Sequence, residues 1–76
     1  MRFEGKIAGV QFDSFGDFEG FWLRTEEGLR EFSSRERDME VLVTRAWRQQ
    51  VALLVIVEHH APHRPVSLVL LRASPE

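Results

Sequence analysis

Hydrophobic positions in the middle of the chain recur with the period of an α-helix. Five of them fall at i, i+3, i+4, i+7 and i+8: Met39, Leu42, Val43, Ala46 and Trp47. This spacing places the five side chains on one face, and charged residues occupy the other faces. The segment from Ser33 to Gln50 is therefore predicted to be an amphipathic helix. Ser33 and Glu36 have the spacing of a capping box at its start.

The rest of the chain has the alternating pattern and turn residues of β-strands. Five strands are predicted: Phe3–Phe12, Phe18–Thr25, Leu29–Phe32, Val51–Val57 and Val66–Leu71. Asp13–Asp17 and Glu26–Gly28 have the composition of turns, and residues 59–65 are predicted to form a loop because two prolines would interrupt a strand ladder.

Two strands depart from simple alternation. In the first, the hydrophobic positions change parity between Ile7 and Val10, which predicts a bulge or sharp bend at Gly9. The segment Val51–Val57 is apolar at both parities, so we expect both of its faces to be covered, one by the barrel interior and the other by the helix.

The predicted element order is β-β-β-α-β-β. One helix cannot cover an open five-stranded sheet, so the sheet is expected to curve and close on itself. A bent first strand and a helix between the third and fourth strands resemble the OB-fold, a partly open five-stranded barrel. We therefore predict one mainly β, OB-like domain over residues 1–76, with residues 73–76 as a frayed tail. An SH3-like barrel is the main alternative, and a split sheet packed on one helix is the next.

Composition narrows the classes of function. The chain has 76 residues, a net charge of −2 and no cysteine or tyrosine. The absence of cysteine excludes disulfides and thiolate metal sites, and favours a reducing, cytoplasmic location. The N-terminal segment has no apolar core of a secretory signal, and no hydrophobic run is long enough to span a membrane. Without a nucleophile motif, a phosphate-binding loop or a cofactor motif, we expect neither an enzyme nor a bound cofactor.

The resemblance to the OB-fold implies a binding face on the second and third strands and their flanking loops. Six residues are the candidates for this face: Phe15, Phe18, Trp22, Arg24, Arg30 and Arg64. The aromatic rings would stack on bases, and the arginines would meet phosphates. A competing interpretation places Phe12, Phe18 and Phe21 in the core and leaves Phe15 and Trp22 as the exposed rings.

Acidic residues crowd the same region and would repel a polyanion. Asp13, Asp17 and Glu19 are close enough in sequence to suggest a cation site, but their spacing does not match a calcium-binding loop. Histidines 59, 60 and 63 suggest a metal site, although a solvated loop is the favoured interpretation. We therefore predict no metal at either place.

Two functional hypotheses remain. The favoured one is a protein-interaction or self-association module, because the net charge is near neutral and apolar residues such as Trp22 and Val41 exceed what the core needs. The final strand, apolar at both parities, could also pair with another chain at its edge. The alternative is binding of single-stranded nucleic acid by the OB-like face.

Overall fold

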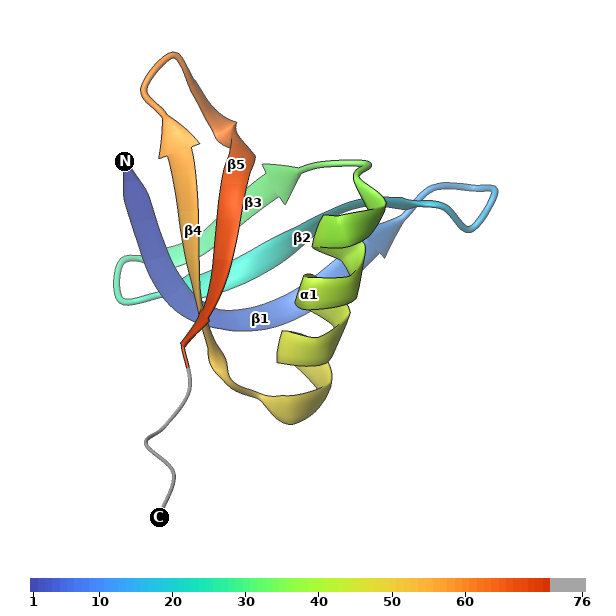
Figure 1. The fold of residues 1–76 in the computed structure, drawn as a ribbon, viewed down its shortest axis with the longest axis horizontal. Coiled ribbons are helices and arrows are strands. Elements are labelled where there is room, and N and C mark those ends of the chain that lie inside the picture. The colour runs from blue at the N-terminus through green and yellow to red at the C-terminus, as the bar shows by residue number, and fades with distance from the viewer. Residues whose placement is uncertain (72–76) are drawn as a thin grey trace.

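The computed structural model describes residues 1–71, which form one five-stranded antiparallel sheet and one helix (Figure 1). The elements are β1 (Arg2–Phe12), β2 (Phe18–Thr25), β3 (Gly28–Ser33), α1 (Arg37–Gln49), β4 (Ala52–Glu58) and β5 (Ala61–Leu71). The predicted class and element order are confirmed. The predicted tail, residues 73–76, lies outside the described residues. Within residues 1–71, no helix is long and apolar enough to cross a membrane.

The strand order is β3-β2-β1-β4-β5, so β1 is central and β3 and β5 are the two edges. β1 pairs with β2 from Lys6 to Phe12 and with β4 from Arg2 to Lys6. The strand therefore changes partner at Lys6, and Figure 1 shows it curving strongly along its length. The sheet is not closed into a ring of hydrogen-bonded strands, but β3 and β5 contact each other across the opening. This arrangement is a partly open barrel.

Glycines allow the bend of β1. The register with β2 passes from Ile7 opposite Leu23 to Gly9 opposite Trp22, which leaves Ala8 as an extra residue. The irregularity predicted at Gly9 is thus confirmed beside that residue. At Gly5 the two strands are so close that a Cβ would collide with the carbonyl oxygen of Arg24. Only glycine permits this approach without displacing the backbone.

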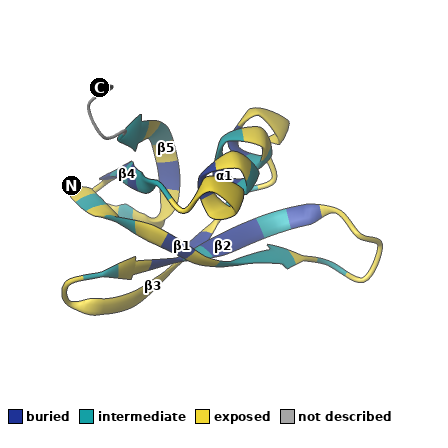
Figure 2. Cartoon of the chain, turned by 90° about the horizontal axis from the view of Figure 1, so that it is seen from below, coloured by how far each residue is buried: buried dark blue, intermediate teal, exposed yellow. Residues whose placement is uncertain are grey.

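The core lies between the curved sheet and the helix (Figure 2). Its buried members are Ile7, Phe18, Phe21, Leu23, Phe32, Met39, Val43, Ala46, Leu53, Val55 and Val57. From α1, Met39, Val43 and Ala46 face this core, as the helical pattern predicts. Trp47 does not follow that prediction, because 41% of its surface is exposed. The helix packs against β1, β2 and β5.

The helix begins at Arg37, four residues later than predicted. Ser33 is still paired with Gly20 in the β2–β3 ladder, so it cannot start a helix. Glu36 is the N-cap residue and forms no side-chain capping bond, so the predicted capping box is wrong. The hydroxyl of Ser34 instead accepts the backbone N–H of Glu36 at 3.2 Å.

The loop predicted at residues 59–65 is wrong, because β5 begins at Ala61 and only His59 and His60 form the turn. Both prolines in this segment are accommodated because β5 is an edge strand. The register passes from Glu58 opposite Ala61 to Val57 opposite Pro65, leaving residues 62–64 without a partner on β4.

Candidate binding surfaces

Trp22 and Arg24 lie on the outer face of the barrel. Leu23 between them is fully buried, and its neighbours along β2 point the opposite way. Trp22 is opposite Gly9 on β1 and Glu31 on β3, and its ring lies beside the bare backbone of Gly9. The contact with Gly9 covers part of the ring, so Trp22 is only partly exposed although it faces outward. The predicted exposure of this ring is confirmed in part.

Arg24 is exposed and is paired with Lys6 on β1. Directly paired residues of antiparallel strands share a face, so Lys6 joins Arg24 and Trp22 on the outer surface. Glu31 and Gln11 occupy the same surface, and the amide of Gln11 donates to Glu31 Oε2 at 3.0 Å. The outer face of β2 and β3 therefore combines one aromatic ring with charges of both signs.

Arg30 is on the other face of the sheet. It is paired with the buried Leu23, and its guanidinium carbon lies 4.6 Å from the centre of the Phe3 ring. Glu27 Oε1 lies 3.6 Å from its Nη2. This cation–π geometry and the weak ion pair hold the side chain against its own chain. The prediction that Arg24 and Arg30 act together on one face is therefore wrong.

The two remaining aromatic candidates have opposite surroundings. Phe18 is only 4% exposed and belongs to the core, so its place on the binding face is corrected and the core interpretation holds for it. Phe15 is 88% exposed in the turn between β1 and β2, and this turn projects from the sheet in Figure 1. Phe12, assigned to the core in the same interpretation, is 48% exposed.

Arg64 does not join the outer face of β2. It is exposed on β5 and lines a separate groove with Ser33, Ser34 and the turn between β4 and β5. In that turn His60 Nε2 lies 3.1 Å from Glu58 Oε1. Among residues 1–71, no three histidines or acids are arranged to hold a metal ion.

The acidic turn between β1 and β2 is tied to the segment before the helix. Arg35 donates to Asp13 Oδ2 at 2.9 Å and lies 3.4 Å from Glu19 Oε1. Asp13 Oδ1 also accepts the backbone N–H groups of Phe15 and Asp17, each at 2.9 Å. The hydrogen bond from Arg35, followed by the backbone donors, holds the pKa of Asp13 below its usual value. This carboxylate binds protein donors, which argues against the cation site considered for this turn.

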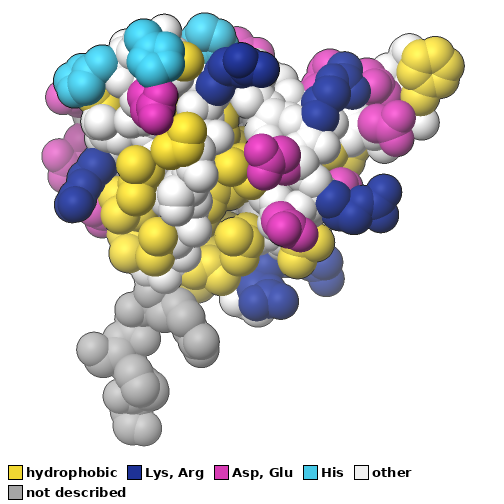
Figure 3. All heavy atoms as spheres, turned by 45° about the horizontal axis from the view of Figure 1, so that its top comes forward, with side chains coloured by type: hydrophobic (Ala, Val, Ile, Leu, Met, Phe, Trp, Pro, Cys, Tyr) yellow, Lys and Arg dark blue, Asp and Glu magenta, His cyan; other side chains and the backbone are white. Residues whose placement is uncertain are grey.

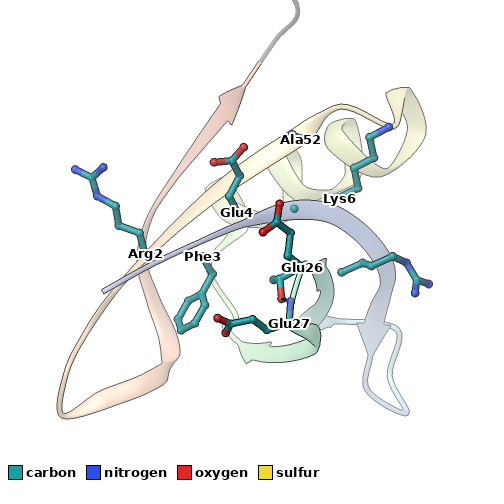
Figure 4. A pocket seen from close by; sticks show the side chains of 10 residues that line it. Arg2, Phe3, Glu4, Lys6, Glu26, Glu27 and Ala52 are labelled. Carbon is teal, nitrogen blue, oxygen red and sulfur yellow. Dashed lines mark hydrogen bonds between the residues drawn. The ribbon is translucent and has the colours of Figure 1, made fainter.

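An open groove of about 650 Å³ lies where β1 leaves β2 to pair with β4. Figure 4 shows acidic side chains (Glu4, Glu26 and Glu27) around it, with basic side chains (Arg2 and Lys6) on its sides. Arg24 also lines the groove, so three acidic and three basic residues surround it. The groove therefore has no net preference for an anionic or a cationic ligand.

The most distinctive surface was not among the predicted sites. Along β4, Leu53, Val55 and Val57 point into the core, so the intervening residues point outward. Their partners on β5 share that face. We call this surface the β4–β5 outer face; its members are Ala52, Leu54, Ile56, Ser67, Val69 and Leu71. Figure 3 shows hydrophobic side chains gathered between the histidines of the β4–β5 turn and the far end of β5.

The expectation that the helix covers the second face of β4 is wrong. The buried side chains of α1 belong to the same core as Leu53 and Val55, so the helix lies on the inner side of the sheet. Val69 is 42% exposed, and Leu54 and Ile56 are only partly buried. The sequence already contained a signal for this surface, because hydrophobic residues occupy both alternating sets of positions along β4.

Comparisons with known proteins give no relative for this chain. No protein-family model, no curated protein and no solved structure matches it.

Proposed function

We propose that this protein is a small, non-enzymatic binding module that acts by protein–protein contact, self-association included, through the β4–β5 outer face. One observation carries the proposal: five of the six residues of this face are apolar and at least partly exposed, and the helix packs on the opposite side of the sheet. Covering apolar surface is favourable by about 25 cal/mol per Å². A contiguous apolar patch on a folded chain is typical of an interaction surface.

The charged and polar groups elsewhere support a binding role over catalysis. Asp13 is held by Arg35 and two backbone donors, and the hydroxyl of Ser34 donates to Met39 Sδ at 3.3 Å. These groups are engaged in holding turns together. The grooves are open and have mixed charge, unlike the enclosed apolar pockets that bind small substrates.

A lysine on this face tests the proposal. Leu54→Lys places a charge at the centre of the face, whereas Val41→Lys places one at an exposed site on α1 and serves as the matched control. We expect Leu54→Lys to weaken self-association, or capture of a partner by the immobilised protein, by about tenfold or more. Val41→Lys should bind like the wild type, and circular dichroism should show all three proteins folded. Equal binding by wild type and Leu54→Lys would contradict the proposal.

Binding of single-stranded nucleic acid by an OB-like barrel is the second candidate. It is supported by the strand order with β1 in the centre and by Trp22, Arg24 and Lys6 on one outer face. It is weakened by the burial of Phe18, by the placement of Arg30 on the other face, and by Glu31 opposite Trp22. We therefore rank it below protein contact.

Tryptophan fluorescence separates this candidate from the first. In a Trp47→Phe variant, Trp22 is the remaining indole, so quenching by an oligonucleotide reports on the outer face of β2. If the candidate is correct, short single-stranded DNA or RNA at low salt should quench this signal at tens of micromolar protein, and added salt should reverse it. Unchanged fluorescence would remove nucleic-acid binding at this face.

A further inference from the structure

We propose that the partner of the β4–β5 outer face is a second copy of this chain, stacked face to face about a two-fold axis. The axis lies in the interface and runs along the strands, between β4 and β5. This inference rests on the proposed function and specifies its partner. Two sheets packed in this way lie about 10 Å apart, with their strands within about 30° of each other.

The register between β4 and β5 supports a second copy by shape. The face consists of three rows, in which Ile56 is beside Ser67, Leu54 is beside Val69, and Ala52 is beside Leu71. At one end the large side chain is on β4 and the small one on β5. At the other end the order is reversed. The side chains of β4 and β5 therefore differ in size in opposite senses at the two ends of the face.

The proposed axis places the larger side chain of each row opposite the smaller side chain of the same row in the second copy. It exchanges β4 with β5 but keeps each row at its own height. Ile56 then lies over Ser67 of the second copy, Leu54 over its Val69, and Ala52 over its Leu71. Each contact combines a larger with a smaller side chain, so the two faces fill the space between them evenly, as close packing requires.

Charges bordering the face select the same axis. Arg2, Glu4 and Lys6 on β1 are paired with Ile56, Leu54 and Ala52, and form a charged row along one side. A two-fold axis across the strands would place Glu4 over Glu4 of the second copy, which is unfavourable. The axis along the strands carries the two charged rows to opposite borders, where they stay in water.

The size of the face sets the strength of the contact. Strands are about 4.8 Å apart and rise about 3.3 Å per residue, so three rows on two strands fall well below the roughly 800 Å² per partner of a standard stable interface. We therefore expect a weak, reversible dimer that forms at high micromolar concentration.

Sedimentation equilibrium from about 10 µM to about 1 mM tests the proposal. The average mass of the wild type should rise from 8.9 kDa toward twice that value. Leu54→Lys and Val69→Asp should each remain monomeric. An equal mixture of the two should dimerise at least about tenfold more tightly than either alone. In the mixed dimer the new lysine faces the new aspartate, while the unaltered Val69 faces the unaltered Leu54.

The outcomes separate this inference from the proposed function. A mixture of Val41→Lys with Val69→Asp is the matched control and should not restore association. If the Leu54→Lys and Val69→Asp mixture also fails, the proposed axis is wrong. If the wild type is monomeric throughout but Leu54→Lys abolishes capture of a different protein, the second copy is excluded and the proposed function stands. If Leu54→Lys changes neither self-association nor the capture of a different protein, both the second copy and the proposed function are overturned.

Discussion

Arg35 shows how single residues hold the irregular parts of this fold in place. Its guanidinium joins Asp13 in the β1–β2 turn to Glu19 at the start of β2, and thereby fixes the segment that leads into α1. Asp13 also closes its own turn through two backbone N–H groups. The projecting turn that carries Phe15 is thus shaped by one carboxylate and one arginine.

The stability of this contact should depend on pH. Because folding lowers the pKa of Asp13, its ionised form stabilises the native state above the unfolded-state pKa of about 4, and the contribution is lost as the pH falls through the lower folded-state pKa. We expect Asp13→Asn to lower the melting temperature by a few degrees at pH 7, since the ion pair is partly exposed. Thermal melts from about pH 7 to about pH 2 should show the difference from wild type shrinking below about pH 4.

A substitution without such contacts provides the comparison. Glu26→Gln changes an exposed carboxylate in the turn between β2 and β3, and should leave the melting temperature nearly unchanged over the same range. If the Asp13→Asn difference stayed constant down to about pH 2, the stabilisation would come from the shape of the side chain and not from its charge.

At the scale of elements, local patterns predicted the helix face and the strands well. The period of Met39, Val43 and Ala46 is a property of the helix itself, so it could be recognised before any packing was known. The bend of β1 could also be predicted, because a change of parity requires an irregularity wherever the strand pairs. These features depend on near neighbours in the sequence.

What failed depended on contacts between distant segments. Ser33 has the local signature of a helix start, but its pairing with Gly20 keeps it in β3. The prolines of β5 argued for a loop, and only its position at the edge of the sheet makes a strand possible there. The resemblance to the OB-fold grouped Arg24 and Arg30 because they lie on adjacent strands, whereas strand register separates them onto two faces.

The dependence on contacts between distant segments also explains why the β4–β5 outer face was not predicted as the binding surface. Hydrophobic residues at both alternating sets of positions on β4 indicate that both of its faces are covered. The local pattern does not identify which element or partner covers each face. From the sequence we expect the barrel interior to cover one face of this strand and the helix to cover the other. The structure places the helix on the inner face, so the functional question is what covers the outer face.

At the scale of the whole molecule, two adjacent leucines separate the requirements of folding from those of binding. Leu53 is fully buried in the core, and Leu54 lies on the β4–β5 outer face. A domain of this size is expected to have a free energy of unfolding of about 4–11 kcal/mol, so Leu53→Ala, at about 2–5 kcal/mol, should remove much of it. Leu54→Ala should cost about 1 kcal/mol or less in dilute solution, because its side chain is only partly buried.

Urea unfolding followed by tryptophan fluorescence measures both leucine variants under the same conditions. At low micromolar protein the unfolding midpoint should fall steeply for Leu53→Ala and little for Leu54→Ala. At about 1 mM the wild type should gain stability from self-association, because a partner that binds only the native state shifts the unfolding equilibrium. Leu54→Ala should lose most of that gain, so the gap between it and the wild type should widen with concentration. A gap independent of concentration would mean that Leu54 contributes to the fold alone, and the surface of β4 would then have no partner in a second copy.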